Sequence, residues 1–140
     1  MIPRKSAQGF SLVELLLVLA IIGILSAIAI PSYLGQRRRA RIVGDAKANA
    51  QVLRMQLENH KAEVGLYGTA GTYTWSSAAT PAASTSPAPG FTAKGGTQMT
   101  YVLTIGSTGL TYGLDVKDKT LANAVVFTTN QNGSNVFTLQ

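Results

Sequence analysis

The longest apolar run of the chain predicts a membrane-spanning helix near its N-terminus. From Leu15 to Gln36 no residue is charged, and the part up to Ile30 is interrupted only by Gly23 and Ser26. As a helix, these 22 residues would span about 33 Å at 1.5 Å per residue. That length matches a bilayer hydrocarbon core of about 30 Å. A buried core helix is the alternative, but the rest of the chain is too short to surround a helix that is apolar on every side.

Residues 37–64 are predicted to continue as an amphipathic helix. Gly65 and Gly68 then supply the stop signal that is typical of a helix C-terminus. We expect the apolar face of this helix to cover a sheet. The apolar positions recur at spacings near three, four and seven residues, as they do on one face of a helix: Ile42, Ala46, Ala50, Leu53, Leu57 and Val64.

Residues 65–97 have the composition of a surface loop, because Ser, Thr, Ala, Pro and Gly dominate the segment. The stretch from Tyr73 to Trp75 could form a short strand within it. The Ser/Thr-Pro-rich part could carry O-glycans, but we favour a plain solvated connector.

Residues 98–140 contain four short runs in which apolar and polar residues alternate. This period of two predicts antiparallel strands with one packed face. Together with the preceding helix, it predicts an α+β fold in which a long N-terminal helix packs on a C-terminal four-stranded antiparallel β-sheet. The runs are separated by the turn sequences GSTG, KDKT and NQNG, and they cover Met99–Ile105, Leu110–Val116, Ala122–Thr128 and Ser134–Leu139.

The charges of the chain are few and unevenly placed. Charged residues make up 13% of the sequence, against about a quarter in an ordinary soluble domain. The net charge of +6 comes from the two flanks of the apolar run: Arg4 and Lys5 precede it, and four arginines follow it. Beyond Arg41, six basic and five acidic residues nearly cancel. The basic pI therefore does not mark the C-terminal part as a nucleic-acid binder.

The sequence offers little chemistry of its own. The absence of cysteine excludes disulfides, thiol catalysis and thiolate metal sites. His60 is the only histidine, and no phosphate-binding loop or nucleophile motif is present. Asp115 and Asp118 lie in a turn where Ca²⁺ could bind, but the neighbouring Lys117 and Lys119 argue against it. We therefore expect a protein that is not an enzyme and has no cofactor or metal site.

The segment around the start of the apolar run carries a more specific signal. It reads Gly9-Phe10-Ser11-Leu12-Val13-Glu14-Leu15-Leu16, follows a short basic leader, and continues through the apolar run to Pro31. This pattern resembles the N-terminus of type IV pilins and pseudopilins, closely over residues 1–35 and by general pattern over residues 36–65.

The resemblance implies a processing site at the Gly9–Phe10 bond. Residues 1–9 would be a leader of the class III signal peptide type, which a membrane-embedded prepilin peptidase removes before methylating the new α-amino group of Phe10. Residues 10–36 would then form the transmembrane and assembly helix, and the whole chain the pilin fold.

The resemblance also gives Glu14, Gly23 and Pro31 roles in assembly. The Glu14 carboxylate would meet the Phe10 amine of a neighbouring subunit, so that a buried charge gains a partner. The alternative is that Glu14 reaches to the membrane surface. The helix between Gly23 and Pro31 would lose regular structure in the filament, since both residue types weaken a helix. The alternative there is an ordinary kink.

As a whole, the resemblance implies a structural subunit of a type IV pilus or related helical homo-oligomeric filament. Its partners would be the membrane before assembly, prepilin peptidase and an inner-membrane assembly platform, and we do not expect nucleic acid as a partner. The precursor would cross the inner membrane once, with its C-terminal domain outside the cytoplasm, and the assembled form would lie on the cell surface. A minor pseudopilin of a type II secretion system and an uncleaved membrane-anchored binding module remain alternatives.

One group of charges conflicts with this orientation. Arg37, Arg38, Arg39 and Arg41 follow the apolar run, and the positive-inside tendency taken alone would keep that side in the cytoplasm. The cleavage signature is more specific, so we give it precedence. The arginines could bind lipid phosphates or DNA, but we favour solvation or pairing with acids of a neighbouring subunit.

Overall fold

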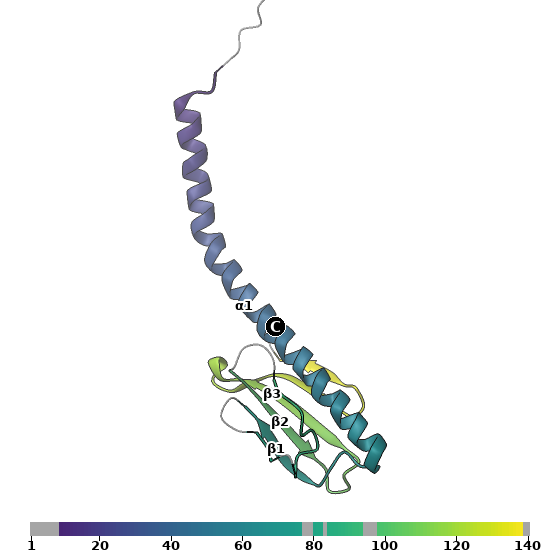
Figure 1. The fold of residues 1–140 in the computed structure, drawn as a ribbon. Coiled ribbons are helices and arrows are strands. Elements are labelled where there is room, and N and C mark those ends of the chain that lie inside the picture. Colours follow the sequence, from purple (N-terminus) through teal and green to yellow (C-terminus); the bar gives the residue numbers. More distant parts are fainter. Residues whose placement is uncertain (1–8, 77–79, 83, 94–97, 139–140) are drawn as a thin grey trace, which may run out of the picture. The chain divides into compact units, whose positions relative to one another are not determined.

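The structure is a computed structural model that describes residues 9–76, 80–82, 84–93 and 98–138 (Figure 1). The chain divides into two compact units, residues 1–38 and 39–140, which are described separately below. The predicted α+β class is confirmed, with one long helix and one antiparallel sheet. The elements in chain order are α1 (Leu12–Val64), β1 (Gly71–Trp75), β2 (Met99–Ile105), β3 (Tyr112–Asp118), the 3-10 helix η1 (Lys119–Leu121), β4 (Ala124–Asn130) and β5 (Asn135–Phe137).

In the second unit, the C-terminal part of α1 lies along one face of the sheet (Figure 1). The predicted apolar face is confirmed over three turns, where Ala46, Ala50, Leu53 and Leu57 are at most 1% exposed. The expected contribution of Val64 is wrong, because its side chain is 61% exposed. The helix ends immediately after it, where Gly65 adopts a φ of +86° and donates its N–H to the Lys61 carbonyl.

The sheet has five strands in the order β1-β2-β3-β4-β5, each antiparallel to its neighbour. The alternation predicted for β2 is confirmed, since Met99, Tyr101, Leu103 and Ile105 are all buried. Between β2 and β3 the chain turns at Gly106–Gly109. The prediction that Leu110 begins the next strand is wrong, because Leu110 is 49% exposed and β3 begins at Tyr112. Short turns join consecutive strands from β2 to β5, which explains the meander order there, whereas a longer segment, residues 76–98, connects β1 to β2.

The sheet has one strand more than the four predicted for residues 98–140. This edge strand, β1, includes the short strand considered at Tyr73–Trp75. It pairs with β2 in the register Gly71↔Ile105 to Trp75↔Tyr101. Its sequence, GTYTW, combines glycine and threonine with two aromatic rings. Trp75 is buried and meets the Phe91 ring edge-on at 5.7 Å, so burial of one aromatic side chain helps to hold this short strand in the sheet.

The segment from Ser84 to Phe91 is not the solvated connector that its composition indicated. Ser86, Ala88 and Phe91 are buried, with exposed fractions of 8%, 1% and 2%. The Phe91 ring lies between those of Trp75 and Tyr101, with an edge-on contact of 5.4 Å to the latter. This segment therefore closes the core beside β1 and β2.

A β-bulge changes the pattern of side chains in β4. The pairing with β3 shifts between Val116 and Lys117, which face Phe127 and Val125 respectively. Val126 is thus the extra residue, and both it and Phe127 are buried although they are adjacent in sequence. A bulge permits this break in the period of two because it locally rotates the strand.

A buried polar contact joins the helix to the sheet. Asn49 lies on the packed face of α1, and its Nδ2 donates a hydrogen bond of 2.8 Å to the Tyr101 hydroxyl on β2. Burial raises the pKa of Tyr101 to about 12, although the hydrogen bond from Asn49 opposes that shift. The hydroxyl therefore stays protonated at neutral pH, and it fixes the helix position along the sheet.

We expect Gly109→Ala to destabilise the second unit by at least about 1–3 kcal/mol, the cost of a residue held in a strained backbone conformation. Gly109 has a φ of +69°, and an added Cβ would lie 2.8 Å from the Gly68 carbonyl oxygen. Its own carbonyl accepts the Tyr67 N–H, which links the turn to the end of α1. Urea unfolding followed by the emission of Trp75, the single tryptophan, would measure the loss.

Gly113→Ala is the matched control for Gly109→Ala. A Cβ added at Gly113 meets no atom within 4 Å, and Gly113 has no left-handed φ. The free energy of unfolding of the Gly113→Ala variant should stay close to that of the parent chain. Equal stability of the two variants would contradict the strain assigned to Gly109.

Candidate assembly helix and processing site

The predicted processing site lies just ahead of the first turn of α1. Gly9 and Phe10 precede the helix, and the Phe10 side chain is 86% exposed. The leader predicted at residues 1–9 falls outside the described residues except for Gly9. Its cleavage and the methylation of Phe10 stay predictions at this point. Gly9 and Phe10 themselves lie outside regular secondary structure.

Glu14 has a local partner that sequence reasoning missed. Its Oε2 accepts the backbone N–H of Ser11 at 3.0 Å, while the Ser11 carbonyl accepts the N–H of Leu15 at 3.2 Å. Ser11 is therefore the N-cap residue and Glu14 the third helical residue, which gives one half of a capping box. The signal was visible in the sequence as Ser-x-x-Glu before an apolar run. A carboxylate here also interacts favourably with the helix dipole.

The apolar part of α1 is uncovered within its own unit. It is the one helix in the described part of the chain that is long and apolar enough to cross a membrane, and none of its most apolar stretch is buried. The exposed large side chains include Leu12, Val13, Leu15, Leu16, Leu17, Val18, Leu19, Ile21, Ile22, Ile24, Leu25, Ile28 and Ile30. A surface this apolar requires lipid or other protein around it.

The positions predicted to weaken the helix are helical here. Gly23 and Pro31 both lie inside α1, and a Cβ added at Gly23 would meet no atom within 4 Å. The predicted loss of helix between these two residues concerns the assembled filament. The helix seen in the single subunit therefore does not test it.

Comparison with known proteins connects this segment to one family. Residues 4–30 match the family described as "Prokaryotic N-terminal methylation motif". The chain is 56% identical over 36 residues to the type IV wide pilus major component PilA4 of Thermus thermophilus, which covers 26% of this chain and 28% of that protein. The N-terminal segment of the chain is therefore similar to that of type IV pilins and carries the methylation motif.

Two further relatives are a fimbrial protein and a pilin of other bacteria. Fimbrial protein Q of Moraxella bovis is 45% identical over 47 residues, 31% of this chain and 30% of that protein. The type IV major pilin protein PilA of Myxococcus xanthus is 48% identical over 51 residues, 36% of this chain and 22% of that protein. The matched part of the chain thus spans less than a third of the length of each of these pilins. No solved structure matches the chain.

The family match contains most of the predicted site residues. Gly9, Phe10, Glu14 and Gly23 lie inside residues 4–30, and Pro31 follows directly. The structure brings Glu14 to the first turn of α1, beside Ser11. The roles predicted for these residues all concern the peptidase or a neighbouring subunit, so they belong to the proposal below.

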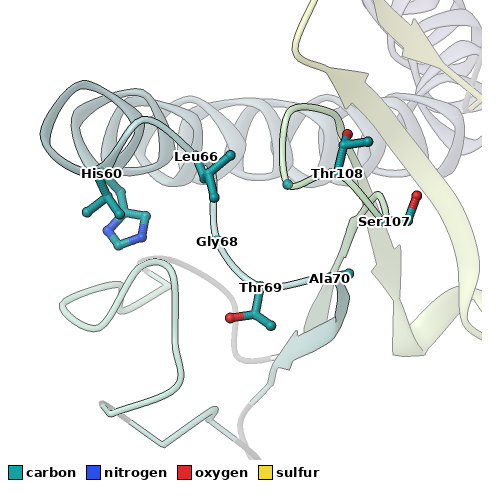
Figure 2. Close-up of a pocket in the computed structure, with 9 residues that line it drawn as sticks. His60, Leu66, Gly68, Thr69, Ala70, Ser107 and Thr108 are labelled. Carbon is teal, nitrogen blue, oxygen red and sulfur yellow. The ribbon is translucent and has the colours of Figure 1, made fainter.

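The second unit has a surface hollow of about 410 Å³ at the C-terminal end of α1 (Figure 2). His60 and Leu66 come from the helix end and the segment after it, and Ser107 and Thr108 from the β2–β3 turn. Its lining combines one imidazole with hydroxyl and aliphatic groups. No group of three or more His, Asp or Glu side chains that could hold a metal ion occurs among the described residues.

The two aspartates considered for Ca²⁺ each serve the local structure. Asp118 Oδ1 accepts hydrogen bonds from the backbone N–H and the hydroxyl of Thr120, and so caps η1. Asp115 Oδ1 accepts the Thr128 hydroxyl at 2.9 Å across β3 and β4. Both residues lie in β3 and not in the predicted turn, and each carboxylate accepts a hydrogen bond from a threonine.

Proposed function

We propose that this protein is a structural subunit of a type IV pilus or a related filament, and that it polymerises through α1. The observation that carries the proposal is the uncovered apolar helix that begins directly after the Gly9–Phe10 junction. Such a helix can rest in a bilayer as a single span before assembly. In a filament, the same surface would be covered by the helices of other subunits.

The proposal assigns the first step to the Gly9–Phe10 bond. Prepilin peptidase cuts this bond and methylates the new α-amino group, which is cationic at neutral pH. Gly9 leaves the backbone accessible because it has no side chain. Since Phe10 and Gly9 lie outside α1, no helical hydrogen bond has to break for the chain to enter a protease site in extended form.

Glu14 supplies the anion for this new cation in a neighbouring subunit. Its Oε2 is used by the Ser11 N–H within the subunit, but a carboxylate has about four acceptor positions on two oxygens. The cap and the intermolecular ion pair are therefore compatible. In a filament core, one amine and one carboxylate per subunit are mutually satisfied only at a single axial offset, which sets the register.

Apolar contact by itself gives little preference for the filament over the membrane, because lipid tails are as apolar as leucine. Close packing and the Glu14–Phe10 pair must then favour assembly. Once the subunit has left the bilayer, water surrounds the fibre, and each covered Leu or Ile side chain stabilises it by about 1.5–3 kcal/mol. Loss of helix between Gly23 and Pro31 would let subunits adjust their packing in the fibre.

In this proposal the subunit waits in the inner membrane with its C-terminal unit outside the cytoplasm. An inner-membrane assembly platform then moves it into the filament on the cell surface. The second unit, which has its own core, would form the outer layer of the fibre. No catalytic step is assigned to the chain.

The decisive experiment is the intact mass and N-terminal sequence of protein sheared from the cell surface. We expect a chain that begins at methylated Phe10 and is recovered from filaments. A chain that begins at Met1 and occurs only in membranes would overturn the proposal in favour of an uncleaved membrane-anchored binding module. A chain cleaved at Phe10 and found with secretion components, without surface filaments, would favour a minor pseudopilin.

Gly9→Val should prevent processing, because a β-branched side chain next to the scissile bond hinders access to the backbone. The measured mass should then equal that of the full chain, and surface filaments should be lost. Gly44→Val is the matched control, since Gly44 is exposed on α1 and a Cβ added there meets no atom within 4 Å. Normal cleavage of Gly9→Val would show that the processing site lies elsewhere.

A further inference from the structure

Two surface hollows of the second unit meet at His60, and we call them together the His60 groove. The first is the hollow of about 410 Å³ described above, and the second has a volume of about 380 Å³. Both are lined by His60, Gly68 and Thr69, so the two hollows adjoin. Figure 2 shows the His60 ring and the Thr69 hydroxyl on the same side of the segment that joins α1 to β1. The whole groove lies within residues 39–140.

The second hollow is lined mainly by groups that both donate and accept hydrogen bonds. Its described lining consists of His60, Gly68, Thr69, Tyr73, Ser84, Thr85, Ser86 and Pro87. A hydroxyl group donates one hydrogen bond and accepts others, and a neutral imidazole has one donor and one acceptor nitrogen. None of the described residues that line either hollow is Asp, Glu, Lys or Arg. The groove is therefore polar without carrying a fixed charge of either sign.

Tyr73 gives the second hollow an aromatic surface that is held in place. The Tyr73 hydroxyl donates a hydrogen bond of 2.9 Å to the Thr69 carbonyl. The Tyr73 ring lies 6.4 Å from the Trp75 ring at an angle of 31°. Tyr73 is half-buried and packs against the core. Because the ring is fixed before any ligand arrives, contact with it costs little additional ordering.

Some of the polar side chains of this hollow are already used by the chain, and others are available. The hydroxyls of Thr85 and Ser86 each form a hydrogen bond with a backbone group of their own segment. Among the described residues, no hydrogen bond engages the side chains of His60, Thr69 or Ser84. These three side chains can therefore bind a ligand without breaking a contact of the fold.

We propose that the His60 groove binds a neutral saccharide, with one pyranose ring in the second hollow against Tyr73. A sugar ring has an apolar face of C–H groups that packs on an aromatic ring, and hydroxyls that donate and accept as the lining does. Each hollow has the volume of a small-molecule site, about 300–1,000 Å³. The first hollow, with Ser107 and Thr108, would take the next ring of an oligosaccharide.

Two other classes of ligand fit the groove less well. Phosphates and carboxylates are typically bound by Arg or Lys, and neither residue type is among the described lining residues. An extended peptide typically binds through backbone hydrogen bonds to a strand edge, whereas the uncommitted polar groups here are side chains. The saccharide proposal concerns the second unit alone. It needs neither cleavage at Phe10 nor polymerisation.

The test observes His60 by NMR in the full chain. His60 is the only histidine, so its imidazole C–H groups give a single set of signals from the groove itself. The chain is held in a phosphocholine detergent, whose headgroup contains no sugar. Methyl glucoside, methyl galactoside and N-acetylglucosamine are titrated separately at constant pH, because an imidazole also responds to protonation. We expect a saturable shift of the His60 signals with at least one of these sugars.

Two variants test the position of the sugar. Thr69→Val removes one hydroxyl and Tyr73→Ala removes the ring, and each should raise the Kd about two- to tenfold. Thr72→Val is the matched control, because Thr72 is exposed on β1 and consecutive strand residues point to opposite faces. It should leave the Kd unchanged. Thr69 is also exposed and precedes β1, so its variant keeps the test valid even if loss of Tyr73 disturbs that strand.

Four outcomes would overturn the inference. The first is the absence of a saturable shift with all three sugars. The second is a shift with glucuronate alone, which would assign the groove to an anion. The third is a shift of the His60 signals on raising the protein concentration without sugar, which would assign the groove to a second copy of the chain. The fourth is an unchanged Kd in both Thr69→Val and Tyr73→Ala, which would place the sugar elsewhere. The sample contains neither peptidase nor filaments, so failure of processing in cells would leave each result unaffected.

Discussion

Glu14→Ala is expected to leave cleavage and methylation at Phe10 intact and to keep the subunit out of filaments. The side chain lies beyond the scissile bond, in the first turn of α1, so the peptidase still meets Gly9 and Phe10. In the fibre, the Phe10 amine of a neighbour would lose its anion. Removing one partner of a buried ion pair typically costs about 3–5 kcal/mol, which is roughly two to three and a half orders of magnitude in an association constant.

The local role of Glu14 requires a second variant. Glu14→Ala also removes the hydrogen bond to the Ser11 N–H, and loss of a helix cap alone costs about 1 kcal/mol. Glu14→Gln keeps a side chain that can cap the helix at this position but has no charge. If the ion pair matters, both variants are processed and neither enters filaments. If the cap matters, only Glu14→Ala fails.

Two quantities are measured for each variant: the N-terminal sequence of the protein in the membrane fraction, which reports processing, and the yield of sheared filaments, which reports assembly. Glu63→Ala is the control, because it removes one exposed acid from the last turns of the same helix. Glu63→Ala should be processed at the same bond as the parent chain and should give the parental yield of sheared filaments. Normal filament yield from Glu14→Gln would refute charge pairing, whatever the result for Glu14→Ala.

Leu57→Ala should produce a large loss of stability in the second unit. Leu57 is fully buried on the face of α1 that packs against the sheet. Truncation of a buried leucine to alanine removes apolar contacts and leaves a cavity, with a typical cost of about 2–5 kcal/mol. This is a large share of the roughly 5–15 kcal/mol that stabilises an ordinary domain. We therefore expect partial unfolding of this unit at growth temperature.

Met55→Ala is a matched control two residues away. Met55 lies on the same helix but is 60% exposed, so its truncation should change the free energy of unfolding by much less. Urea unfolding of the full chain in detergent, followed by Trp75 emission, compares the two. Trp75 is suited to this because it is buried against Phe91 in the same core. Equal losses in both variants would contradict the assigned packing face.

Local patterns in the sequence predicted most of the fold. The helix and four strands follow from periods that backbone geometry imposes, namely about 3.6 residues in a helix and two in a strand. The buried positions of β2 and the face formed by Ala46, Ala50, Leu53 and Leu57 were read directly from such periods, and the structure buries them. The apolar run from Leu15 to Gln36 was equally clear, because its signal depends on composition and length alone.

The candidate site was proposed from the sequence as a set of positions close together in the chain. The junction at Gly9–Phe10 and the acid at Glu14 are adjacent in the chain, so no fold is needed to bring them together. The capping contact between Glu14 and Ser11 was also local, and its signal was present although it was not used. The further partners that we propose for these residues belong to other molecules, which one chain does not reveal.

Only the tertiary structure decided the features that join distant segments. Asn49 and Tyr101 are 52 residues apart and meet in a buried hydrogen bond, and Asn49 alone looks like an ordinary polar helix residue. Edge strand β1 and the buried segment ending at Phe91 have loop-like compositions, yet the Trp75–Phe91–Tyr101 contacts hold them on the core. The bulge at Val126 depends on pairing with β3. The sequence by itself thus determined the elements and the N-terminal methylation motif, because both arise from neighbours along the chain. Contacts between distant residues depend on where the whole sheet places them.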